Sequence, residues 1–87
     1  MELKLNENLA FSKNDNGEIR IIIFNDDNKV YTIDKFVAFV FNQIADGKDF
    51  ETILSTLEKE GTGKTKNELK IILDELVADF KKLQFIN

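Results

Sequence analysis

The stretch from residue 30 to residue 53 constrains the fold of this 87-residue chain more than any other part. It begins with Val30-Tyr31-Thr32-Ile33, a run of high strand propensity, and continues directly into Asp34, a residue type that caps helices. The following segment is apolar on nearly every side, which predicts a helix buried in the centre of the molecule. Gly47 suits the left-handed position that ends a helix, and Asp49 can cap a second helix directly after it. A strand is therefore expected to lead into two short capped helices.

Three strands are predicted before the first of these helices, over about residues 9–12, 18–24 and 29–33. The middle segment is rich in isoleucine and almost wholly apolar, so it is expected at the centre of the sheet. Turn signals built from Asn, Asp and Gly separate the three strands, at residues 13–17 and 25–28. Connections this short favour hairpins, and the segments therefore predict a three-stranded antiparallel meander.

Three helices are predicted to follow, over about residues 35–46, 50–59 and 66–84. The third opens with a capping box, in which Thr65 and Glu68 satisfy each other's backbone amides. It has one apolar face of helical period, while Ile71 points to the opposite side. The members of that face are Leu69, Ile72, Leu73, Leu76, Phe80 and Leu83, with Val77 on the flank. Strands first and helices second predict an α+β fold of the winged helix-turn-helix type, with residues 1–87 forming a single domain.

Composition excludes several classes of function. The chain has no cysteine and no histidine, which removes thiolate and imidazole metal ligands and the usual general base near neutral pH. The carboxylates show no spacing that converges on an acid–base pair, so neither an enzyme nor a cofactor or metal is expected. The net charge of −4 argues against a nucleic-acid surface. No apolar run is long enough for a membrane span or signal peptide, so a cytoplasmic protein without membrane contact is expected.

A set of short motifs runs along nearly the whole chain in one order. These are Gly17 with the strand after it, residues 30–34, the apolar helix at 36–41, Asp46-Gly47, residues 50–53, Leu57, Leu76-Val77 and Phe85-Ile86. In this order and spacing the chain resembles the PqqD family, the leader-peptide-binding domains also called RiPP recognition elements. It departs from the family pattern at Gln84, where members often have a glycine.

The resemblance implies a winged helix-turn-helix fold that binds peptide instead of DNA. Family members capture the N-terminal leader of a ribosomally made precursor peptide and present it to a modifying enzyme, often a radical SAM enzyme. The leader is expected to add as an antiparallel strand beside the third strand and to rest against the third helix. An open sheet edge can also pair with a second copy of the chain, so a homodimer stays open.

Specific recognition of a peptide at a sheet edge needs side chains, because the backbone bonds there are largely blind to sequence. The candidates are Lys29, Val30, Tyr31 and Thr32 on the third strand, and Lys70, Leu73, Asp74, Val77 and Lys81 on the third helix. A second interpretation applies to several of them. Tyr31 and Leu73 fit equally well as core residues, and the charged side chains fit a solvated helix face.

A winged-helix transcriptional regulator is the alternative from another class. DNA affinity depends on clustered Lys and Arg against the phosphates. Arg20 is the only arginine of the chain, and the third helix carries Glu68, Asp74, Glu75 and Asp79. The charge pattern therefore favours the peptide-binding hypothesis.

Overall fold

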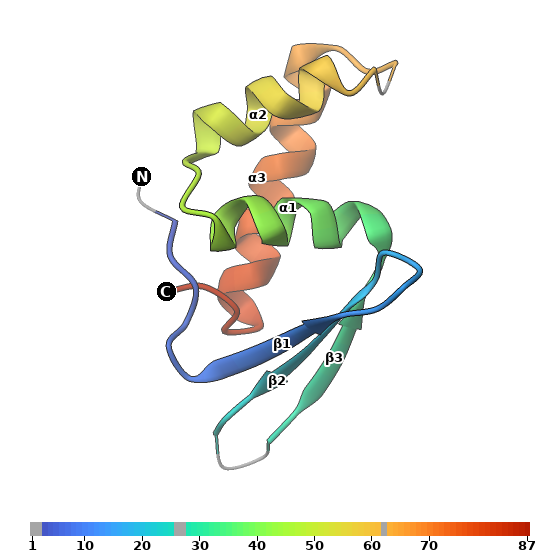
Figure 1. Cartoon of the computed structure of the whole chain (residues 1–87). Coiled ribbons are helices and arrows are strands. Elements are labelled where there is room, and N and C mark those ends of the chain that lie inside the picture. The colour runs from blue at the N-terminus through green and yellow to red at the C-terminus, as the bar shows by residue number, and fades with distance from the viewer. Residues whose placement is uncertain (1–2, 26–27, 62) are drawn as a thin grey trace.

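The computed structural model describes residues 3–25, 28–61 and 63–87, so the predicted turn at 25–28 lies partly outside the described residues. The elements are β1 (Leu9–Lys13), β2 (Ile19–Ile23), β3 (Val30–Ile33), α1 (Lys35–Ala45), α2 (Phe50–Lys59) and α3 (Lys66–Lys82). This order confirms the predicted α+β arrangement, a three-stranded antiparallel sheet followed by three helices (Figure 1). Within the described part of the chain, no helix is long and apolar enough to cross a lipid bilayer.

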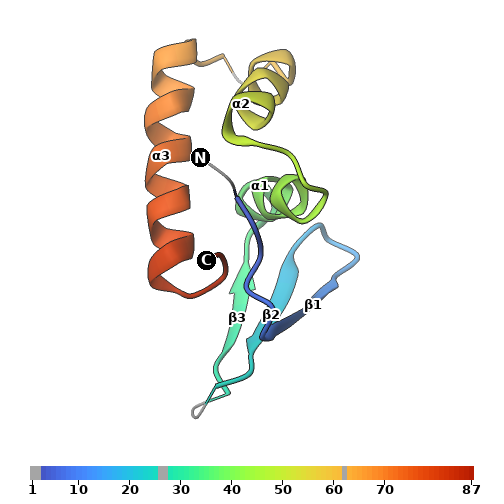
Figure 2. The ribbon, with the colours of Figure 1, turned by 90° about the vertical axis from the view of Figure 1, so that its left-hand side faces the viewer.

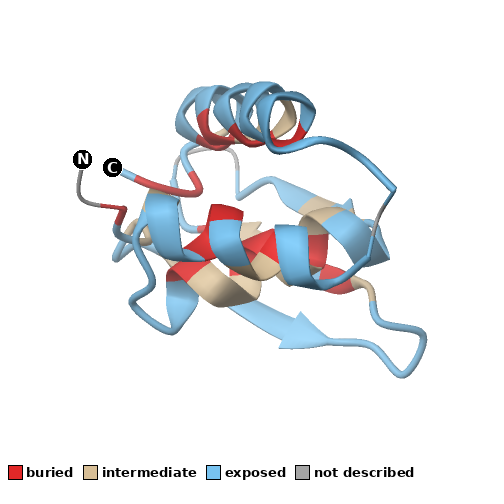
Figure 3. Ribbon diagram, turned by 90° about the horizontal axis from the view of Figure 1, so that it is seen from above, coloured by how far each residue is buried: buried red, intermediate tan, exposed pale blue. Residues whose placement is uncertain are grey.

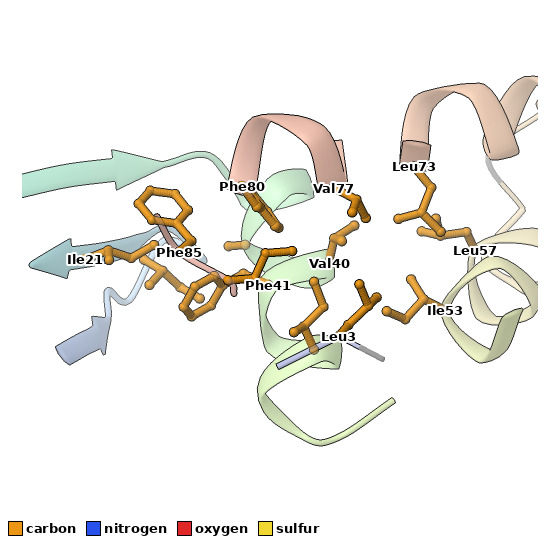
Figure 4. Packing of buried hydrophobic residues seen from close by; sticks show 14 of the residues in the cluster. Leu3, Ile21, Val40, Phe41, Ile53, Leu57, Leu73, Val77, Phe80 and Phe85 are labelled. Atoms are coloured by element: carbon orange, nitrogen blue, oxygen red, sulfur yellow. The ribbon is translucent and has the colours of Figure 1, made fainter. Parts of the chain in front are cut away.

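The sheet has the order β1-β2-β3, with the isoleucine-rich strand at its centre as predicted. In register, Ile21 of β2 lies opposite Phe11 on β1 and Tyr31 on β3. Ile19, Ile21 and Ile23 are buried whereas Arg20 between them is exposed, because successive side chains of a strand point to opposite faces. The helices all lie on one side of the sheet (Figure 1). The three isoleucines belong to the core cluster, and Ile21 points into it (Figure 4).

One core joins the sheet to the helices. Phe41 of α1 is fully buried, and its ring meets Phe11 of β1, Phe80 of α3 and Phe85 edge-on, at centroid distances of 5.0, 6.2 and 6.1 Å. Edge-to-face aromatic pairs of this kind add to the free energy gained by burying the rings. In the view from above, the buried positions of α3 face the other elements of the fold, and its exposed positions face away from them (Figure 3).

Each helix begins at the cap that the sequence predicted. The carboxylates of Asp34 and Asp49 accept hydrogen bonds from the amides of Val37 and Thr52, at 2.9 and 2.8 Å. At α3, the Glu68 amide donates to the Thr65 hydroxyl and the Thr65 amide donates to the Glu68 carboxylate, both at 3.2 Å. These bonds satisfy amides that have no partner within the first turn of a helix.

The end of α3 differs from the prediction. The helix stops at Lys82 instead of continuing to residue 84, because Gln84 takes the left-handed backbone conformation with φ of 66°. The chain then reverses, and the Phe85 amide donates to the Phe80 carbonyl at 2.8 Å. Gln84 thus occupies the conformation that a glycine at the end of a helix usually takes.

The segment before β1 is fixed to the end of the chain, which the sequence did not predict. Leu5 and Ile86 form an antiparallel bridge, and the Asn6 amide donates to the Phe85 carbonyl at 2.9 Å. Leu3 joins the core with 6% of its surface exposed. The two ends of the described chain therefore lie side by side (Figure 1).

Candidate functional site

The edge of the sheet at β3 is open. Among the described residues, β3 pairs with β2 along one side and with no strand along the other. Figure 2 shows β3 as the strand that lies nearest to α3. A free edge of this kind presents backbone donors and acceptors that an extended peptide can satisfy.

The register shows which backbone groups of β3 point outward. The Ile23 amide donates to the Lys29 carbonyl at 3.0 Å, so residue 29 is hydrogen-bonded to β2. Bonded and non-bonded pairs alternate along an antiparallel ladder, which directs the backbone of Tyr31 toward β2 as well. The amides and carbonyls of Val30 and Thr32 therefore point away from the sheet, at the open edge.

The four predicted strand residues have different environments. Lys29, Val30 and Thr32 are exposed, and Val30 keeps 58% of its surface accessible. Tyr31 is half-buried, and its ring packs edge-on against that of Phe85 at 5.2 Å between centroids. Much of the Tyr31 side chain thus belongs to the core, whereas Lys29, Val30 and Thr32 are accessible to a peptide.

Two of the predicted helix residues are part of the core. Leu73 is fully buried and Val77 is 4% exposed. Figure 4 shows both side chains pointing from α3 into the interior, toward Val40 and Leu57. Their side chains present almost no surface to a peptide, because both are packed into the core.

The charged helix residues lie away from β3. Lys70 and Asp74 line a hollow of about 310 Å³ together with Asp49, Phe50 and Glu51 at the start of α2. Lys81 shares their flank of α3, because residues 74 and 81 are two turns apart. In Figure 1 the start of α2 lies to one side of α3 and β3 to the other. The structure therefore places Lys70 and Asp74 beside the start of α2, and Lys81 on the same flank of α3 closer to its end.

The opposite flank of α3 is apolar and was missed as a candidate surface. Helical spacing puts Ile72, Leu76 and Leu83 on this flank, and all three are half-buried. The end of the flank lies near the β2–β3 hairpin, since the Asn25 side chain donates to the Gln84 side chain at 3.4 Å. The signal was present in the sequence as part of the apolar face, but the periodicity alone could not distinguish full from half burial.

Comparison with known proteins gives a result at the level of the fold. No family model matches the chain, and no curated protein sequence matches it. A solved structure, that of TbiB1 in complex with the TbiA(beta) leader peptide, superimposes with a TM-score of 0.88. This chain has the fold of TbiB1. The alignment covers 97% of this chain and 94% of the TbiB1 chain, at 12% sequence identity. The similarity to TbiB1 is thus structural, and membership of the PqqD family stays a prediction.

Proposed function

We propose that this chain is a non-catalytic module that captures the leader of a ribosomally made precursor peptide and presents it to a modifying enzyme. The open edge of β3, in a fold shared with the leader-bound TbiB1, carries the proposal. The PqqD resemblance adds the partner class, a radical SAM enzyme, and the proposal keeps the cytoplasmic setting that the sequence predicts. A homodimer through the same edge would compete with the peptide for it.

Backbone bonds alone do not account for specific capture. Val30 and Thr32 offer two amides and two carbonyls to a guest strand, and each net hydrogen bond contributes about 0.5–1.5 kcal/mol. Ordering a flexible peptide costs on the order of 2–5 kcal/mol, which offsets most of that gain. Apolar contacts must supply the surplus. We assign this role to Tyr31 and to the flank of α3 that carries Ile72, Leu76 and Leu83, all of them apolar and half-buried.

The proposed site therefore combines the outward backbone groups of Val30 and Thr32 with that apolar flank. Lys29 borders it at the start of the strand. Lys70, Asp74 and Lys81 belong to the other flank of α3, and there the hollow lined by Lys70 and Asp74 offers a surface to a different partner, such as the modifying enzyme. Leu73 and Val77 support the site from the core.

The test replaces one outward amide at each edge of the sheet. Peptides are selected by display from short segments encoded in the source genome, and the best binder is titrated against the labelled protein by amide NMR. Thr32→Pro removes an outward donor of β3 and should weaken binding by about 10-fold. Lys13→Pro is the matched control at the end of β1, the other edge strand, and should bind like the unaltered protein.

The expected spectrum shows the largest shifts at the amides of residues 29–33. The proposal fails if the two proline variants, both folded, bind the peptide equally well. It also fails if the shifts lie elsewhere, for example around the hollow between α2 and α3.

A further inference from the structure

The face of the sheet turned away from the three described helices (Figure 1) carries an apolar strip. Ala10, Ile22 and Val30 lie directly opposite one another across the three strands. Phe24 follows at the end of β2 as the diagonal neighbour of Val30, and 56% of its surface is exposed. Ile22 is half-buried and Val30 is 58% exposed. Apolar side chains thus gather on a solvent-facing sheet surface and extend to the open edge.

The strip and the open edge share residues. Val30 and Thr32 direct their backbone groups outward at the edge, and their side chains point to this uncovered face. A guest strand beside β3 continues the pleat of the sheet. Every second guest side chain would therefore lie on the uncovered face, directly beside Val30 or Thr32.

The two outward positions differ in chemistry. The position beside Val30 extends the strip that contains Ile22 and Phe24. The position beside Thr32 lies in line with Arg20 and Ser12, which are exposed on the same face. One outward position of the guest thus meets apolar side chains, and the next meets polar ones and a guanidinium.

We propose that side chains on both faces of the guest strand contribute to its recognition. On the uncovered face, an apolar side chain of the guest lies beside Val30 and a hydrophilic one beside Thr32. This inference rests on the leader-binding function proposed above. In an antiparallel guest, the hydrophilic residue precedes the apolar one by two positions. The recognised segment is then apolar at neighbouring positions, one facing Tyr31 and the α3 flank and one facing the strip.

Reading on both faces fixes the register of the guest. A slip of one residue would exchange its inward and outward side chains. A slip of two residues would place the apolar outward side chain beside Thr32 and Arg20. The uncovered face therefore specifies which segment of a longer peptide binds, beyond what backbone pairing alone can do.

The test compares two equally exposed apolar residues. Val30→Glu should weaken binding of the selected peptide by about 5-fold, the size expected for loss of a favourable cross-strand pair. Ile71→Glu is the matched control, since Ile71 is 59% exposed on the outer side of α3; its binding should be unchanged. Selection repeated against Val30→Glu should replace the apolar guest residue by Lys or Arg. Val30→Thr keeps the branched shape of the strand residue and should give a smaller loss of the same sign.

The outcomes separate this inference from the proposed function. If Thr32→Pro weakens binding but the Val30 variants bind and select the same peptides as the unaltered protein, the uncovered face plays no part and the inference is wrong. If no selected peptide shifts the amides of residues 29–33, both the inference and the proposed function are wrong.

Discussion

At the scale of single residues, Gln84 shows how the chain stabilises an unfavourable backbone conformation. Its φ of 66° lies in the left-handed region, which costs a residue with a side chain about 1–2 kcal/mol. Hydrogen bonds to the backbone carbonyl and the side chain of Gln84 compensate for part of that cost. The Asn6 side chain donates to the Gln84 carbonyl at 2.8 Å, and the Asn25 side chain donates to the Gln84 amide oxygen at 3.4 Å.

Gln84→Gly should raise the free energy of unfolding by about 0.5–1 kcal/mol, because glycine adopts this conformation without strain. The carbonyl bond from Asn6 is kept, and only the long bond from Asn25 is lost. Gln84→Ala is the control, since it loses the same bond and keeps the strain. Urea unfolding measures both, and an alanine variant more stable than the glycine variant would contradict the account.

At the scale of elements, the caps connect helix stability to pH. Hydrogen bonds from the side chain and amide of Thr52 lower the pKa of Asp49 below its usual 3.8. Bonds from the amide and then the hydroxyl of Thr65 likewise lower the pKa of Glu68 below its usual 4.5. A carboxylate with a lowered pKa in the folded state stabilises the fold above its usual pKa. That contribution is lost as the pH falls through the folded-state pKa.

The urea midpoint should therefore decrease as the pH falls below about 4.5, with the loss continuing below about 3.8. Asp49→Asn keeps a good cap but removes the titration, so its midpoint should fall less steeply with pH. Asp15→Asn, at an exposed loop carboxylate that caps no helix, should keep the original profile. Equal slopes for Asp49→Asn and the unaltered chain would show that this cap does not contribute to the acid sensitivity.

Local rules explain why the elements were predictable. Strand propensity, helical period and the caps at Asp34, Asp49 and Thr65 each act within a few residues, and the observed bounds follow them closely. The flank of α3 that faces β3 was not predictable, because it depends on how the helix is rotated against α1 and α2. Hence Ile72, Leu76 and Leu83 were assigned only to the core face, and Lys70 and Asp74 were named as peptide-binding candidates although they lie beside the start of α2.

At the scale of the whole molecule, contacts between distant parts of the sequence were also beyond prediction. The pairing of Leu5 with Ile86 joins segments from opposite ends of the chain, and neither segment has a periodic pattern that announces it. Phe85 beside this bridge is fully buried and meets the rings of Tyr31, Phe41 and Phe80, at 5.2, 6.1 and 5.6 Å. One side chain after the last helix thus connects β3, α1 and α3.

Phe85→Ala should lower the free energy of unfolding by about 3–5 kcal/mol, as expected for a large cavity in a core. That is a large part of the stability of a small domain, and loss of the ring would also loosen Tyr31 and with it β3. Phe24→Ala removes a mostly exposed ring and should change stability by about 0.5 kcal/mol or less. Thermal unfolding compares the two, and similar losses would contradict the central place of Phe85.

The two outer strands of the sheet have a joint consequence for the protein at high concentration. Among the described residues, β1 and β3 each pair with β2 alone, so the sheet has two different edges with unpaired backbone groups. If β3 of one copy met β1 of the next, the contact would be head-to-tail, and growth would continue as a filament unless the rotation between copies closed a ring. A peptide bound along β3 would act as a chain terminator, and its supply would help to keep the protein dispersed.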